Sequence, residues 1–181
     1  MMKSICVYCG SSASVPEPYF EAARELGRLI ATAGHRLVYG GAHVGLMGAV
    51  ADAALAAGGP VTGVIPRTLI IREVAHGGLT EMHEVESMHD RKALMAELSD
   101  AFIALPGGFG TFEEFFEIVT WKLLDYHRKP IILLNTDDYY AHLLAFLGHA
   151  GEHKFIRPAH RQLFHTAATP AEALRLATET P

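Results

Sequence analysis

Residues 107–114 contain the groups that could bind a phosphate next to a catalytic carboxylate. The glycines of this stretch are Gly107, Gly108 and Gly110. Backbone N–H groups uncovered by side chains can converge on an anion at the positive end of a helix dipole. We expect Thr111 to cap the helix and to offer its hydroxyl to the phosphate. Glu113 and Glu114 should lie in the first turn, where a carboxylate would repel a phosphate, so the pattern predicts phosphate binding with chemistry nearby.

A glycine-rich turn between a strand and a helix is weak evidence when taken alone. The glycines could simply make a tight turn, and the glutamates could simply complement the helix dipole. The stretch is not a Walker loop, because no Gly-Lys-Ser/Thr follows it. It does not match a dinucleotide fingerprint either, because its glycines have a different spacing and come late in the chain.

Arg91 and Lys92 are the candidate cations for the same site. Ser87 is expected to cap their helix with Asp90 as its capping-box partner. Basic residues on a helix are often only solvated, and that alternative stays open here. However, the helix directly precedes the strand that leads into residues 107–114, so its N-terminal end should lie near the ligand. An arginine there could bind a phosphate through two bonds or hold a carboxylate in place.

The elements that position these residues alternate between strand and helix. Apolar or alternating runs predict strands at residues 4–9, 36–39, 61–65, 80–85, 101–105 and 130–134. Helical spacing and caps predict helices at residues 19–33, 88–98, 112–123 and 137–147, with another starting at Thr169-Pro170. A helix of small residues is also expected after Gly48, ending at Ala57. This order predicts a single α/β domain over residues 1–181, with a Rossmann-like, doubly wound, mostly parallel sheet and helices on both faces.

Three glycine-containing loops should meet at the carboxyl edge of this sheet, where ligands of such folds bind. They are Gly10-Ser11-Ser12, Gly40-Gly41 with Gly45, and Gly107–Thr111. One such loop could be accidental, whereas three on one edge indicate a cleft for a phosphorylated, nucleotide-sized ligand. We therefore count Gly10, Ser11 and Gly41 among the substrate-binding candidates.

The helix after residue 111 has two apolar sides. The side expected to pack on the sheet contains Phe112, Phe115, Phe116, Val119 and Leu123. Glu114 lies nearly opposite, in line with Trp121, and a second apolar side usually meets another helix, so we expect a homodimer contact there. Glu114 would then lie in a partly dry pocket, where burial raises its pKa and a cation lowers it. We expect Glu113 to lie on the solvated surface, although we keep it among the substrate-binding candidates.

The net charge and the lengths of the apolar runs argue against several classes of protein. The net charge is -5 with no basic tract, which argues against nucleic acid as the partner. No signal peptide and no apolar run long enough for a membrane span are found, which predicts a cytoplasmic protein.

Cys6 and Cys9 should face opposite sides of a strand and pack in the core. The eleven histidines show no spacing typical of a metal site, so no metal is predicted.

Two segments together resemble the signature motifs of the LOG (Lonely Guy) family. They are Met88-His89-Asp90-Arg91-Lys92 and Pro106-Gly107-Gly108-Phe109-Gly110-Thr111-Phe112-Glu113-Glu114. Further landmarks are Cys9-Gly10-Ser11-Ser12, Tyr39-Gly40-Gly41, Gly45-Leu46-Met47-Gly48 and Ile65-Pro66. The departures are Phe109 in place of the usual tyrosine and Ala42 where a third glycine is common.

The resemblance implies a homodimer that hydrolyses the N-glycosidic bond of cytokinin riboside 5′-monophosphates without a cofactor. It implies that Arg91 and Glu114 are the catalytic pair. The residues it assigns to the 5′-phosphate are Gly107, Gly108, Gly110 and Thr111. It also assigns Glu73, Lys92 and Thr120 to the substrate pocket. A fixed carboxylate is suited to this reaction, because positive charge develops on the sugar as the bond breaks.

Two alternatives remain. The first is a nucleosidase that acts on AMP or other purine monophosphates without a cytokinin role. The second is a non-catalytic nucleotide or cofactor carrier, which would need the phosphate site but not Glu114. A lysine decarboxylase is disfavoured, since none of the five lysines lies in a motif for a pyridoxal-phosphate Schiff base.

Overall fold

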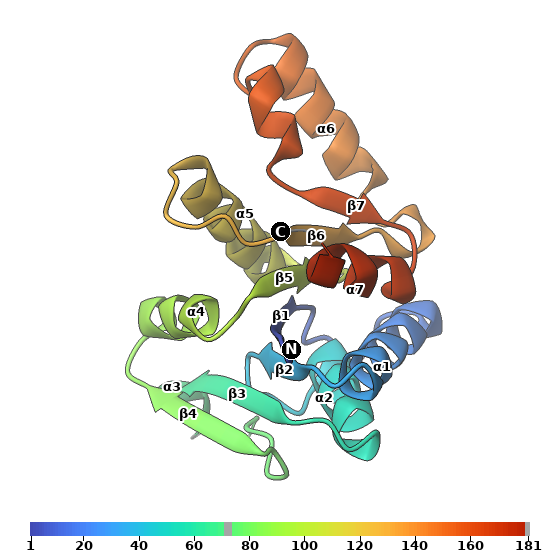
Figure 1. Ribbon diagram of the computed structural model, residues 1–181, viewed down its shortest axis with the longest axis vertical. Helices are drawn as coiled ribbons and strands as arrows, with labels where there is room; N and C mark the ends of the chain where they lie inside the picture. The colour runs from blue at the N-terminus through green and yellow to red at the C-terminus, as the bar shows by residue number, and fades with distance from the viewer. Residues whose placement is uncertain (71–73, 180–181) are drawn as a thin grey trace.

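The strands of the chain form one parallel sheet. The computed structural model describes residues 1–70 and 74–179, and within them the strand order is β4-β3-β2-β1-β5-β6-β7 with every pair parallel (Figure 1). The strands are β1 (Ser4–Tyr8), β2 (Arg36–Tyr39), β3 (Val61–Pro66), β4 (Glu81–Val85), β5 (Ala101–Ala104), β6 (Ile131–Leu134) and β7 (His165–Ala167). The predicted α/β class is confirmed, and the strand at residues 80–85 lies at the edge, as its alternating pattern indicated.

Helices connect successive strands. They are α1 (Glu17–Thr32), α2 (Gly45–Ala56), α3 (Arg67–Ile70), α4 (Met88–Glu97), α5 (Phe109–Leu123), α6 (Ala141–Glu152) and α7 (Pro170–Glu179). The predicted cap of α4 is confirmed, because the Asp90 N–H donates to the Ser87 hydroxyl at 3.1 Å. The cap of α7 is also confirmed, since the Glu172 N–H donates to the Thr169 hydroxyl at 3.2 Å.

The sheet separates two apolar layers. On one face, α1, α2 and α7 pack against strand residues such as Ile5 and Val7. On the other face, α4 and α5 pack against Cys6 and Phe102. Both cysteines are buried and free, and Cys9 packs in the first of these layers whereas Cys6 packs in the second. The expectation that they face opposite sides of the sheet is therefore confirmed.

Strand β1 marks the point at which the strand order reverses. It pairs with β2 on one side and with β5 on the other. In open parallel sheets the crevice for a ligand lies at such a point, outside the carboxyl ends of the strands. The loops after β1 and β5 meet there, and the Gly10 N–H donates to the Pro106 carbonyl at 3.2 Å. The fold thus brings two of the three predicted glycine loops into contact.

The prediction that Asp137 and Asp138 open a helix was wrong. They belong to a short 3₁₀ turn, Thr136–Asp138, and both have positive φ angles. Aspartate tolerates this left-handed region better than most residues. The Asn135 side chain closes the turn by accepting from the Tyr140 N–H at 2.7 Å, and α6 begins only at Ala141.

Over the described residues, each helix is too short or too polar to cross a bilayer. The cytoplasmic location stays a prediction.

Candidate active site

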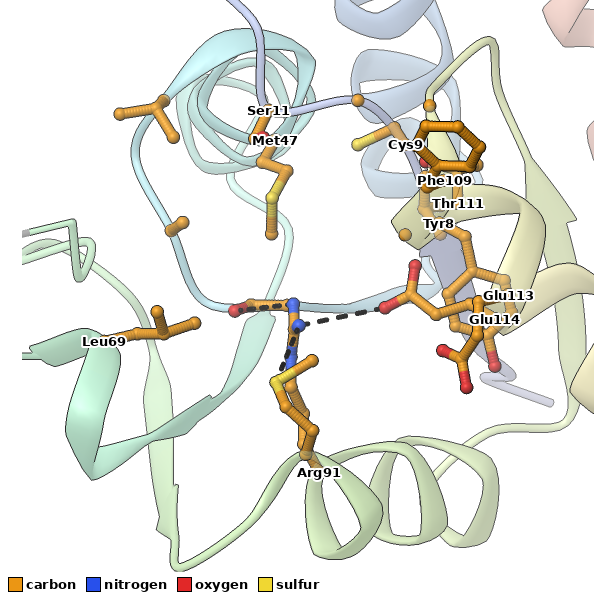
Figure 2. A pocket seen from close by; sticks show the side chains of 18 of the residues that line it. Tyr8, Cys9, Ser11, Met47, Leu69, Arg91, Phe109, Thr111, Glu113 and Glu114 are labelled. Carbon is orange, nitrogen blue, oxygen red and sulfur yellow. Dashed lines mark hydrogen bonds and ion pairs between the residues drawn. The ribbon is translucent and has the colours of Figure 1, made fainter.

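A cavity of about 400 Å³ lies at the carboxyl end of β1, between α4 and the start of α5 (Figure 2). Its polar lining side chains are Tyr8, Ser11, Arg91, Thr111, Glu113 and Glu114. The backbone of Gly10, Gly40, Gly108 and Gly110 completes the polar part of the wall. Most of the predicted site residues therefore converge on one cavity.

Helix α5 begins three residues earlier than its apolar pattern indicated. Gly108 is the N-cap residue, and the first helical bond runs from the Phe112 N–H to the Gly108 carbonyl. The N–H groups of Phe109, Gly110 and Thr111 precede that bond, so they are not used within the helix and are available to an anion. Thr111 does not cap the helix as expected. Instead it is the third residue of α5, buried in the cavity wall.

The predicted orientation of α5 was only partly right: Phe115 is buried, and Phe112 and Val119 pack against the same core layer, as expected. The buried residues of α5 are Thr111, Glu114, Phe115 and Ile118. Phe116 and Leu123, which were expected to pack on the sheet, are partly exposed on the outside. The true inner stripe has the i, i+3, i+7 spacing of a buried helix face, but two of its members are polar. Those two polar residues, Thr111 and Glu114, are the ones that face the cavity.

Arg91 is a buried cation in the centre of the site and not a solvated surface residue, with 7% of its surface exposed. Its Nε donates to the Val64 carbonyl at 3.1 Å, and Nη2 donates to the Gly40 carbonyl at 3.2 Å. Nη1 lies 3.8 Å from Oε1 of Glu114. Figure 2 shows the Glu114 carboxylate turned toward the guanidinium across the cavity. Two backbone carbonyls thus fix Arg91 so that it faces one carboxylate.

Glu114 is a buried carboxylate with a strongly perturbed pKa. Burial raises its pKa to about 7, although the Arg91 guanidinium acts in the opposite direction. A carboxyl group with a pKa near neutrality can exchange protons at the pH of most cells, as an acid or base catalyst must. The balance between burial and the nearby cation follows the prediction made from the helix pattern.

Lys92 is buried as well, but it does not line the cavity in the described structure. Its Nζ is bonded to Glu113 and lies 3.0 Å from Oε1 of Glu117, both on α5. Burial alone would lower the pKa of Lys92, but the bonds to the two carboxylates outweigh it and raise the pKa. Lys92 therefore links α4 to α5 behind the catalytic pair.

The remaining candidates lie in different places. Gly107 is close behind the cavity, and a Cβ on it would overlap the Thr111 hydroxyl. Gly41 has a positive φ of 76° and faces Ile65 and Met82 instead of the cavity. Thr120 is exposed on α5, and its hydroxyl donates to the Phe116 carbonyl. Glu73 lies outside the described residues.

Gly40 was missed as a site residue, although the sequence marks its loop. A Cβ on Gly40 would overlap Nη2 of Arg91, so only glycine leaves room for the guanidinium. The apolar end of the cavity was missed too. Its lining side chains are Ala42, Val44, Met47, Leu69, Val74 and Met88. They come from two loops and from the helices α2, α3 and α4, and no local pattern connects them.

The sequence and fold match known proteins over most of the chain. Residues 47–177 match a family model described as "Possible lysine decarboxylase". The chain is 56% identical over 160 residues to a cytokinin riboside 5′-monophosphate phosphoribohydrolase of Rhodococcoides fascians, covering 88% of this chain and 81% of that protein. It is 46% identical over 173 residues to one from Arabidopsis thaliana, covering 96% and 76%. A solved Moco carrier protein of Chlamydomonas reinhardtii superposes with a TM-score of 0.74 at 25% identity, covering 99% and 97%.

Proposed function

The chain belongs to the LOG family of cytokinin riboside 5′-monophosphate phosphoribohydrolases, and we propose that its Arg91–Glu114 cavity carries out that reaction. The substrate is a cytokinin riboside 5′-monophosphate, and the products are the free base and ribose 5-phosphate. The observation that carries the proposal is the buried pair of Arg91 and Glu114, 3.8 Å apart, next to the free N–H groups of α5.

The phosphate is assigned to the start of α5. Gly108 and Gly110 expose their backbone to the cavity, and Thr111 and Ser11 add hydroxyl groups to the same wall. An anion at this place is stabilised by the dipole of a fifteen-residue helix. Binding energy from the phosphate, which does not react, positions the sugar for the chemical step.

Glu114 is assigned to the anomeric carbon. The bond between C1′ and the base nitrogen breaks, and its electron pair leaves with the base, which takes up a proton from solvent. The ionised carboxylate stabilises the positive charge that develops on the sugar and orients a water molecule. The water oxygen then bonds to C1′ and gives a proton to Glu114, which releases it to solvent. Arg91 orients the carboxylate and keeps a fraction of it ionised.

The base is assigned to the apolar end of the cavity. Met47, Leu69, Val74 and Met88 offer surface that suits a purine ring and an N6-linked hydrocarbon group. AMP shares the sugar, the phosphate and the bond that is cleaved, so we expect it to be cleaved too. An AMP nucleosidase without a cytokinin role is therefore the main alternative.

Two other classes fit less well. The fold also occurs in the Moco carrier protein, but a carrier of an anionic ligand gains nothing from a buried carboxylate, which is costly to ionise. The family model's description names lysine decarboxylase. Among the described residues that line the cavity there is no lysine, and Lys92 behind it is occupied by two carboxylates.

We propose a homodimer that uses the outer side of α5 together with α6. The predicted Trp121 side is not available as a whole, because Ile118 and Glu114 on it are buried within the subunit. A groove of about 350 Å³ lies instead between Phe116 and Leu123 of α5 and Leu147 of α6. Helix α6 projects beyond β7 in Figure 1, and Phe155 after it is 86% exposed. A second copy would cover this apolar surface.

The test is to incubate the protein with isopentenyladenosine monophosphate and with AMP, and to measure free base and ribose 5-phosphate. Both should be cleaved, and Glu114→Gln or Arg91→Ala should lower turnover by at least about 10²-fold. Glu25→Gln, which removes an exposed carboxylate on α1, serves as the control and should leave turnover unchanged. Nucleotide binding without product would favour a carrier, and normal turnover in Glu114→Gln would remove Glu114 from the mechanism.

A further inference from the structure

The pair Lys92 and Glu113 lies next to the catalytic pair on the same two helices, and of the two only Glu113 lines the cavity. The side chain of Lys92 is 6% exposed, so its ammonium is withdrawn from water. It bonds to Glu113 and to Glu117, which are one turn apart on α5. One buried cation therefore binds two carboxylates of the helix that carries Glu114.

The ammonium group of Lys92 donates its hydrogen bonds to side chains of α5. An ammonium has three donors, and two of them are taken by Glu113 and Glu117. Moving the ammonium to a substrate would break both ion pairs; because the Glu113 and Glu117 side chains are partly open to solvent, the cost would fall mainly on the buried ammonium, which would lose two acceptors. The neighbouring Arg91 has other partners: it bonds to the Gly40 carbonyl and lies 3.8 Å from Glu114.

We infer that Lys92 is a positioning residue that fastens α5 to α4 and sets the charge around Glu114, and that it is not a ligand of the nucleotide phosphate. The inference rests on the proposed role of Glu114. It assigns the two adjacent basic residues to different tasks: Arg91 faces the reacting carboxylate, and Lys92 neutralises the carboxylates on either side of it.

The charged groups around Glu114 show how Lys92 affects the ionisation of that carboxyl. From α4, Arg91 and Lys92 favour its ionised form; on α5, Glu113 and Glu117 oppose ionisation. The groups on β1 that interact with it are the Cys6 thiol and the Tyr8 phenol, together with the Cys9 thiol just after the strand, all kept neutral by burial. Without Lys92, two uncompensated negative charges would flank Glu114, and its carboxyl would hold its proton to a higher pH.

The experiment is a pH titration of the Glu114 carboxyl by ¹³C NMR, with the signal assigned by its loss in Glu114→Gln. In Lys92→Met the midpoint should rise by about half a pH unit or more, whereas Lys92→Arg should keep it. Adding Glu113→Gln and Glu117→Gln to Lys92→Met should bring the midpoint back toward that of the wild type. The titration measures the Glu114 carboxyl without any substrate. It can therefore test the role of Lys92 even if the protein does not catalyse the proposed reaction.

Ligand binding separates the two roles of Lys92. The affinity for ribose 5-phosphate should change less than about threefold in Lys92→Met if the lysine only positions α5. Lys129→Met is the matched control, because Lys129 also anchors α4, through the Ala96 carbonyl at 2.8 Å, but away from Glu114. It should leave both the midpoint and the affinity unchanged. A loss of ribose 5-phosphate affinity by about 10²-fold with an unmoved midpoint would overturn the inference and make Lys92 a phosphate ligand.

Discussion

The Arg91 guanidinium fills the position that a side chain on Gly40 would take. The Gly40 carbonyl also accepts from Nη2 of that guanidinium at 3.2 Å. The glycine thus provides both the room for the cation and one of its bonds. Because Arg91 in turn faces Glu114, the conformation of a residue at the end of β2 determines the geometry of the catalytic pair.

The first prediction follows from this overlap. Gly40→Ala should displace the guanidinium and lower kcat/KM for AMP by about 10²-fold, since a small misplacement of a catalytic group has effects of this size. Gly27→Ala is the control, because a Cβ there meets the Val50 carbonyl in the contact between α1 and α2, far from the cavity. It should lower the free energy of unfolding without changing kcat of the folded enzyme. Equal losses of activity in the two variants would contradict the prediction.

The second prediction concerns the pH dependence of the reaction. The carboxylate form of Glu114 is the active one, and its pKa is about 7 because the group is buried. The kcat/KM should therefore fall as the pH is lowered through about 7. The phosphate of the substrate also titrates, at about pH 6, so the residual activity of Glu114→Gln provides the baseline. If the midpoint of the kcat/KM profile lies near pH 4.5, Glu114 is solvated and not buried. If kcat/KM instead falls as the pH rises above 7, Glu114 acts as a general acid in its protonated form.

The third prediction concerns stability. A carboxyl with a pKa raised to about 7 in the folded state, against an ordinary 4.5, binds its proton more tightly when folded. This group therefore lowers the free energy of unfolding as the pH rises from about 4.5 to about 7. Between pH 5 and pH 8 the effect should be about 2 kcal/mol. Glu114→Gln should lose this dependence in urea unfolding, so its stability relative to the wild type should be higher at pH 8 than at pH 5.

The sequence was sufficient to predict the parallel sheet, the caps of α4 and α7, and most of the polar residues that meet at the cavity. It was not sufficient to predict the whole inner side of α5, because Phe115 faces inward as expected whereas Phe116 and Leu123 do not. Thr111 and Glu114 belong to the buried stripe, but periodicity arguments place polar residues outside. Local rules fail here because the site needs polar groups in the interior.

The ion pairs of Lys92 and the contact of Gly40 with Arg91 were not predicted, for a related reason. The partners of Lys92 lie on a helix that follows the next strand, so their distance depends on the packing of α4 against the sheet. Gly40 and Gly41 are adjacent and identical in type. Only the left-handed conformation of Gly41 turns it away from the cavity and leaves Gly40 facing Arg91.

The fourth prediction concerns the support of the glycine turn. The Tyr140 hydroxyl is buried and donates to the Leu105 carbonyl at 2.6 Å, whereas the more exposed Tyr139 donates to the Gly107 carbonyl at 2.7 Å. Tyr140→Phe leaves a buried carbonyl without its partner and should lower the free energy of unfolding by about 1–2 kcal/mol. Tyr139→Phe should lower it by less than about 0.5 kcal/mol, because water can replace the lost donor. Denaturant unfolding of the two variants measures the difference, and equal effects would contradict the assignment.

The last prediction tests the surface proposed for the dimer. Leu123→Glu and Phe155→Glu place charges in or beside the groove between α5 and α6, and burying an unpaired charge between subunits is strongly unfavourable. Both variants should sediment as monomers at protein concentrations where the wild type is a dimer. Tyr126→Glu is the matched control on the Trp121 side, where Tyr126 is 75% exposed. It should remain dimeric; dissociation by Tyr126→Glu alone would return the interface to the Trp121 side, and a monomeric wild type would refute the dimer.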